Sequence, residues 1–161
     1  MRSNFYLMVI LSLLCAFLLQ IYPLYGEWRY WRPCFVLMVT AFWLLHEPFR
    51  FGIGSAWGCG LALDVITGGL YGAQALAFSI CAYLLQMSVE RMLHFRVWHQ
   101  AGVIMVLVLI SQLVVLSLNL LLRDEVSKAM IFYPAIVSAL CWIPLCMILN
   151  RFYRPLSTRA G

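Results

Sequence analysis

Hydrophobic residues fall in six long stretches along the chain, and polar residues gather in the short segments between them. The stretches cover residues 5–22, 34–45, 53–67, 70–89, 103–122 and 131–149. A helix needs roughly 20 apolar residues to cross a bilayer core about 30 Å thick, and most of these stretches come close to that length. The pattern predicts an all-α integral membrane protein in which six transmembrane helices form one compact bundle over residues 1–161.

The second and third stretches are too short for an ordinary crossing. They fit a locally thinned bilayer or a pair of helices buried in the bundle, and a four-span arrangement with a re-entrant hairpin stays open as an alternative. The first stretch follows Arg2 and is longer than the apolar core of about 7–15 residues in a signal peptide. We therefore expect it to be a retained span.

Basic residues are divided unequally between the two ends of the predicted helices. With six spans and both termini inside, seven basic residues fall on the inner side: Arg2, Arg50, Arg91, Arg96, Arg151, Arg154 and Arg159. Four fall on the outer side: Arg29, Arg32, Arg123 and Lys128. An excess of Lys and Arg marks cytoplasmic loops, so both termini are expected in the cytoplasm.

Composition supports the membrane assignment, because 65% of the residues are hydrophobic and only 11% are charged. A soluble domain is about 45–50% apolar, so soluble enzymes and nucleic-acid-binding modules are excluded. The net charge of +5 comes from basic residues beside apolar stretches, which is typical of topology signals and predicts no nucleic-acid partner. The segment 91–99 mixes cations with large apolar residues and resembles an interfacial stretch on membrane lipid.

Candidate chemistry is sparse. The six cysteines contain no C-x-x-C pair, and His46, His94 and His99 lack ligand spacing, so neither a metal nor another cofactor is expected. There is no Gly-rich phosphate loop and no G-x-S-x-G motif, and no two carboxylates lie together inside a predicted span. We therefore predict no catalytic residues.

Asp64 is the only one of the six acidic residues that lies inside an apolar stretch. An aspartate in the middle of a membrane helix costs about 2.5–3.5 kcal/mol, so it should face protein and accept hydrogen bonds. It precedes Gly68 by four residues, which places it about 6 Å from the outer end of its helix. Two interpretations stay open: a polar anchor that partner segments recognise, or a carboxyl group that holds neighbouring helices together. Candidate hydrogen-bond partners are Gln74, Ser79, Ser111 and Gln112.

Small residues recur at four-residue spacing around Asp64. One ridge contains Ala56, Gly60, Asp64 and Gly68, and a second contains Gly54, Gly58 and Ala62. The ridges are offset by two residues, about 200° around a helix, so we expect neighbours on both sides of this helix. Such ridges let helices approach closely in lipid, and internal packing is favoured over a dimer interface.

Several short motifs in the first four stretches resemble one family. They are Leu18-Leu19-Gln20-Ile21 with Pro23, then Arg32-Pro33, then Pro48 with Arg50 and Gly52, then Gly60-x-x-x-Asp64-x-Ile66-x-Gly68, and finally Gly72, Ala75-Leu76, Ser79-Ile80 and Ala82-Tyr83-Leu84. Together they resemble the MreD family of the bacterial rod-shape machinery, most closely its proteobacterial members. The last two stretches match that family only in hydropathy and length.

The resemblance implies a six-span helical protein of the bacterial inner membrane without known enzymatic activity. It also implies an assembly with an MreC-like bitopic protein, a RodA-type glycosyltransferase, a class B penicillin-binding transpeptidase and, directly or indirectly, the MreB filament. The family further resembles in fold the substrate-capture subunits (S-components) of energy-coupling-factor transporters.

Two functions follow as hypotheses. The first is a non-enzymatic scaffold of the cell-elongation complex that links MreC and MreB to the peptidoglycan synthases. The alternative is a membrane subunit of the S-component type, with a small ligand or lipid precursor bound near Asp64. Structural or partner-binding candidates under these hypotheses are Asp64, Gly60, Gly68, Gly54, Gly58, Gln74, Arg32, Pro33 and Arg50.

Overall fold

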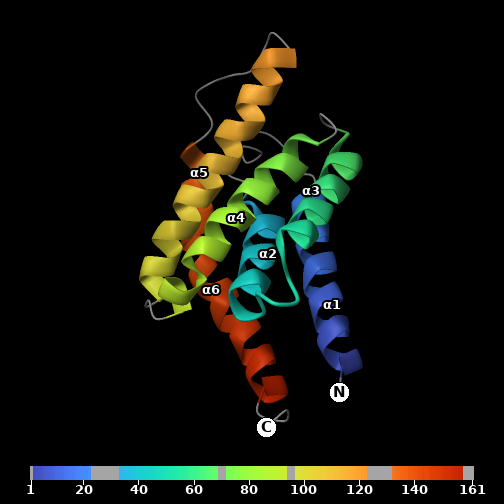
Figure 1. The fold of residues 1–161 in the computed structure, drawn as a ribbon, viewed down its shortest axis with the longest axis vertical. Coiled ribbons are helices and arrows are strands. Elements are labelled where there is room, and N and C mark those ends of the chain that lie inside the picture. The colour runs from blue at the N-terminus through green and yellow to red at the C-terminus, as the bar shows by residue number, and fades with distance from the viewer. Residues whose placement is uncertain (1, 23–32, 69–71, 94–96, 123–131, 158–161) are drawn as a thin grey trace.

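The computed structural model describes residues 2–22, 33–68, 72–93, 97–122 and 132–157. Within these ranges the chain is all-helical, as the hydrophobic pattern predicts. The six helices are α1 (Arg2–Ile21), α2 (Phe35–His46), α3 (Ile53–Thr67), α4 (Ala73–Leu93), α5 (Val97–Leu122) and α6 (Phe132–Ser157). Figure 1 shows the N-terminal end of α1 and the C-terminal end of α6 at one end of the molecule, and the C-terminal end of α3 beside the N-terminal end of α4 toward the opposite end.

Helices α5 and α6 extend furthest beyond the apolar stretches that predict them. Helix α5 begins at Val97 instead of residue 103, and α6 continues to Ser157 instead of ending at residue 149. Polar residues at a helix end still form backbone hydrogen bonds, so hydropathy underestimates helix length there. Helix α6 continues past Pro134 and Pro144 without interruption in its helical assignment.

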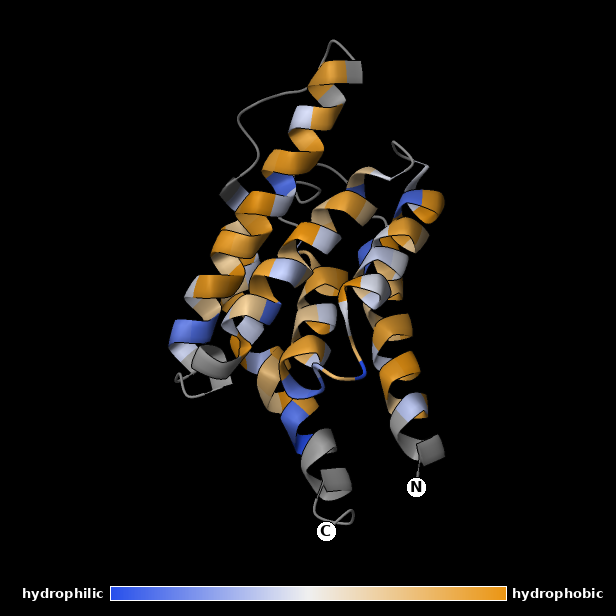
Figure 2. Cartoon of the chain, viewed as in Figure 1, coloured by the Kyte–Doolittle hydropathy of each residue, from blue (hydrophilic) through white to orange (hydrophobic). Residues whose placement is uncertain are grey.

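Over the described residues, two helices have the length and apolarity of a membrane crossing. These segments are Trp98–Leu118 in α5 and Tyr133–Arg151 in α6. The shorter apolar segments are Tyr6–Ile21, Phe35–His46, Ile53–Thr67 and Ala73–Val89. Figure 2 shows hydrophobic residues along most of the length of the helices, with fewer hydrophilic residues among them.

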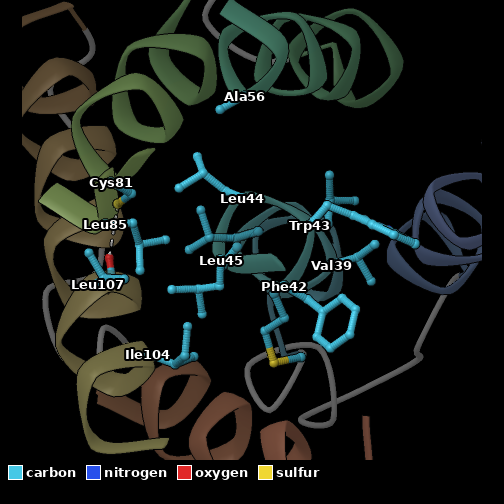
Figure 3. Close-up of a cluster of buried hydrophobic side chains, with 14 of the residues drawn as sticks. Val39, Phe42, Trp43, Leu44, Leu45, Ala56, Cys81, Leu85, Ile104 and Leu107 are labelled. Atoms are coloured by element: carbon cyan, nitrogen blue, oxygen red, sulfur yellow. Dashed lines mark hydrogen bonds between the residues drawn. The ribbon is translucent and has the colours of Figure 1, made fainter. Parts of the chain in front are cut away.

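Helix α2 is the central element of the fold. All of its residues from 36 to 45 are buried, and it packs against α1, α3, α4 and α6. Figure 3 shows Trp43 extending from α2 toward α1, while Leu45 points toward the side where α4 carries Leu85. A helix of 12 residues is about 18 Å long, shorter than a bilayer core. Burial inside the bundle explains why α2 is apolar around its whole circumference.

The buried start of α2 is held by side chains of other helices. The Cys34 amide donates to Ser138 Oγ of α6 at 3.0 Å, and the Phe35 amide donates to Gln20 Oε1 of α1 at 3.0 Å. Trp43 Nε1 donates to Ser12 Oγ of α1 at 2.9 Å. The first amides of a helix have no partner within the helix, and unpaired amides are costly in an apolar interior. Polar side chains of α1 and α6 therefore fix the position of α2.

Candidate functional site

Asp64 of α3 caps the N-terminus of α4. Its side chain is 1% exposed, and its carboxylate accepts hydrogen bonds from three backbone amides. Gly72 N lies 2.9 Å from Oδ2, Gln74 N lies 3.1 Å from both oxygens, and Ala75 N lies 3.2 Å from Oδ2. The carboxylate therefore satisfies amides that α4 itself leaves without partners.

The local chain geometry allows this contact. Gly68 follows the last residue of α3 in a left-handed conformation with φ of 62°, and Gly72 has φ of 99° just before α4. Glycine adopts positive φ without the steric cost that a side chain brings. The turn can thus present the Gly72 amide to Asp64, one helical turn back from Gly68. The positive end of the α4 dipole then faces the negative carboxylate, which adds a favourable electrostatic interaction.

Gly60 brings the two helices close enough for the cap. A Cβ atom at this position would lie 2.6 Å from Ala75 Cα and 2.6 Å from the Gln74 carbonyl oxygen. Both are backbone atoms, so a side chain at position 60 would push α4 away from α3. Gly60 and Asp64 are four residues apart on one face of α3, and both contact the first turn of α4. Close approach and capping are therefore parts of one arrangement.

The predicted hydrogen-bond partners of Asp64 are corrected by this geometry. Gln74 is a partner through its backbone amide, whereas Ser79 Oγ donates to Ala75 O and Ser111 Oγ donates to Val108 O within their own helices. Gln112 Nε2 instead donates to Cys34 Sγ, 3.5 Å away. Backbone amides at the start of α4, and not these side chains, lie within hydrogen-bond distance of the Asp64 carboxylate. The sequence signal for them is an aspartate followed by a glycine-rich turn and a new apolar helix.

The expectation of neighbours on both sides of α3 is also corrected. The ridge with Gly60 and Asp64 contacts α4, but a Cβ atom at Gly54 or Gly58 would meet nothing within 4 Å. Gly54 and Ala62 are exposed and Gly58 is half-buried. Helix α3 packs mainly against α4, so its second small-residue ridge has no close neighbour among the described residues.

The remaining candidates lie apart from Asp64. Pro33 is buried just before α2, at the residue that precedes Cys34. Arg50 is exposed in the α2–α3 connection, where its Nε lies 3.9 Å from Glu47 Oε2. Arg32 lies outside the described residues, as do the other basic residues assigned to the outer side, namely Arg29, Arg123 and Lys128.

The arrangement around Asp64 suits helix pairing and not acid–base chemistry. Both carboxylate oxygens accept backbone hydrogen bonds, and the group is buried from any diffusing substrate. Within the described ranges, no group of three or more His, Cys, Asp or Glu side chains has a geometry that could hold a metal ion. Fold and site thus define a small all-helical protein with apolar helices, whose buried acid joins two neighbouring helices.

Comparison with known proteins gives the family. The family described as rod shape-determining protein MreD matches residues 1–152. A relative from Haemophilus influenzae, "Rod shape-determining protein MreD", is 24% identical over 139 residues, which are 86% of each chain. No solved structure matches the chain. The chain belongs to the MreD family, a family of membrane proteins, and its membership fits a role in determining rod shape.

Replacing Asp64 tests the cap. In Asp64→Leu, the Gly72 amide just before α4 and two amides in its first turn lose their acceptor, and the free energy of unfolding is expected to fall by about 2–3 kcal/mol. Asp64→Asn keeps one carbonyl oxygen and is expected to lose less. The measurement is SDS-induced unfolding of the purified protein in detergent. Equal stability of Asp64→Leu and the native protein would contradict the cap.

Replacing Gly60 tests the close approach, with Gly58 as a matched control on the same helix. Gly60→Ala forces backbone atoms of α3 and α4 apart and is expected to cost about 1–3 kcal/mol in the same unfolding measurement. Gly58→Ala meets open space and is expected to be neutral or stabilising by up to about 1 kcal/mol. Similar losses in both variants would show that helix propensity, and not contact with α4, decides the result.

Proposed function

We propose that this chain is a non-enzymatic membrane scaffold of the cell-elongation complex. In this role it binds an MreC-like bitopic protein and links it to a RodA-type glycosyltransferase and a class B penicillin-binding transpeptidase. It also connects, directly or indirectly, to the MreB filament. The observation that carries the proposal is the buried Asp64 carboxylate, whose oxygens accept hydrogen bonds from backbone amides at the start of α4. It is made in a chain that belongs to the MreD family.

The proposed setting is the bacterial inner membrane, crossed by all six helices as one domain with both termini in the cytoplasm. Three observations support this arrangement in the membrane. The termini lie at the same end of the molecule, as six crossings require (Figure 1). The predicted inner side carries seven of the eleven basic residues. Helices α2 and α3 are short, and α2 is enclosed by its neighbours, so neither has to span lipid alone.

The scaffold acts by position. With this orientation the C-terminal end of α3 and the N-terminal end of α4 face the periplasm, where peptidoglycan is built, while the α2–α3 connection and the C-terminal end of α6 face the cytoplasm. The Asp64 cap fixes α3 against α4. It thereby fixes the position of the ridge of Gly54, Gly58 and Ala62, which faces away from the bundle. A ridge of small residues lets a second helix approach closely in lipid. We assign this ridge to the transmembrane helix of the MreC-like partner.

The ligand-binding alternative receives less support from the site. A ligand that recognises Asp64 would have to displace backbone amides from the carboxylate and open a side chain that is 1% exposed. Such a change would unpair the first turn of α4. The scaffold requires no such rearrangement, because the cap already performs its structural role.

Adding bulk to the open ridge tests the scaffold. Gly58→Leu has room in the chain itself, so the protein is expected to fold normally. If the MreC-like helix packs on this ridge, its co-purification from native membranes should fall about tenfold, with loss of rod shape in cells.

Gly102→Leu in α5 is the matched control. This glycine is also exposed with nothing within 4 Å of its Cβ position, but it lies on a different helix. Co-purification should be unchanged for this variant. Normal partner binding and normal cell shape with Gly58→Leu would contradict the assignment of the ridge to the partner.

A further inference from the structure

An open groove runs between α1 and α6, with α2 as its floor. Its volume is about 470 Å³, and its walls include Leu11 and Cys15 of α1, Val39 of α2, and Leu145 and Ile148 of α6. Helices α1 and α6 each pack on α2, which separates them and leaves the space between them open. The groove lies on a different part of the molecule from Asp64, which is on α3.

The groove is suited to hydrocarbon. Apart from cysteine thiols, Ser12 is the only lining residue with a polar side chain. Its hydroxyl is already engaged, because it donates to Val9 O at 2.8 Å and accepts from Trp43 Nε1 at 2.9 Å. An occupant therefore gains little from polar groups inside the groove, and apolar contact is the main attraction.

A cationic hollow adjoins one end of the groove. Ile148 lines both spaces, and the second hollow, of about 540 Å³, is lined by Met147, Asn150 and Arg151 as well. Arg151 is exposed, and no ion pair joins it to another residue of the described chain. It lies toward the C-terminal end of α6, where Figure 1 places both chain termini. The groove and the adjoining hollow together form an apolar site with the Arg151 guanidinium and the Asn150 amide at one end.

We propose that this groove binds an anionic phospholipid of the cytoplasmic leaflet. One acyl chain occupies the space between α1 and α6, and the phosphate group contacts Arg151 and Asn150. A basic residue attracts anionic lipid headgroups near the membrane surface, which matches the charge at this end of the groove. The choice of leaflet rests on the membrane orientation proposed above, but the site itself does not.

The groove combines apolar walls with a cation at its mouth, which matches the two parts of a phospholipid. The groove extends along α6 from Cys141 to Leu149, which is about 12 Å of helix. The volume of the groove is in the range of about 300–1,000 Å³ that small ligands occupy in proteins.

Native mass spectrometry of the full chain tests the site. The purified protein is titrated with phosphatidylglycerol or with phosphatidylethanolamine of the same acyl composition. Phosphatidylglycerol is expected to bind about fivefold more tightly, and Arg151→Gln should remove that preference without changing phosphatidylethanolamine binding. Equal binding of both lipids to the native protein would overturn the proposal.

Substitutions in α1 test the apolar part of the site. Cys15→Trp places a large ring in the groove from an exposed position, so both lipids should be lost while the fold is kept. Leu14→Trp is the matched control, because Leu14 is the neighbouring exposed residue and does not line the groove. Unchanged lipid binding with Cys15→Trp would overturn the proposal, and loss of a co-purifying bitopic protein instead would assign the groove to a helix. Failure here leaves the ridge on α3 and the scaffold untouched.

Discussion

The hydrogen bonds from the first amides of α4 to Asp64 are the interaction on which the rest of the structure depends. An apolar environment offers no water to the unpaired amides at a helix start, so a bundle must supply acceptors itself. Asp64 supplies them from the preceding helix, and Gly60 permits the close approach that brings them within 3.2 Å. Helix α4 then packs against both α2 and α5, so the orientation of α4 affects most of the bundle.

The same physical requirement is met a second time at α2, by different chemistry. Two uncharged side chains accept hydrogen bonds there: Ser138 from the Cys34 amide just before the helix, and Gln20 from the Phe35 amide at its first residue. They come from α1 and α6, far apart in the sequence, so these hydrogen bonds tie the first and last helices to the centre. The two helix starts lie in different parts of the bundle, and each is fixed by side chains from outside its own helix. This explains how a chain with few polar residues specifies one arrangement of apolar helices.

Much of the fold could be predicted from the sequence, and the limits have physical reasons. Hydropathy located six helices because burial and lipid both select long apolar stretches, and Asp64 stood out because a lone acid in such a stretch is costly. Of its predicted partners only Gln74 is confirmed, and through its backbone amide, because side-chain candidates can be read from a sequence whereas backbone amides are present at every residue. The open faces of α3 at Gly58 and of α1 at Cys15 depend on how the helices pack, which hydropathy does not encode.

The most direct test of the central claim is hydrogen exchange at the Gln74 and Ala75 amides, followed by NMR of the purified protein. If Asp64 accepts these amides, both should exchange slowly in the native protein and at least about tenfold faster in Asp64→Ala. Amides in the middle of α4, such as that of Tyr83, should stay protected in both proteins and so report that the helix is intact. Equal exchange at Gln74 and Ala75 in the two proteins would contradict the account.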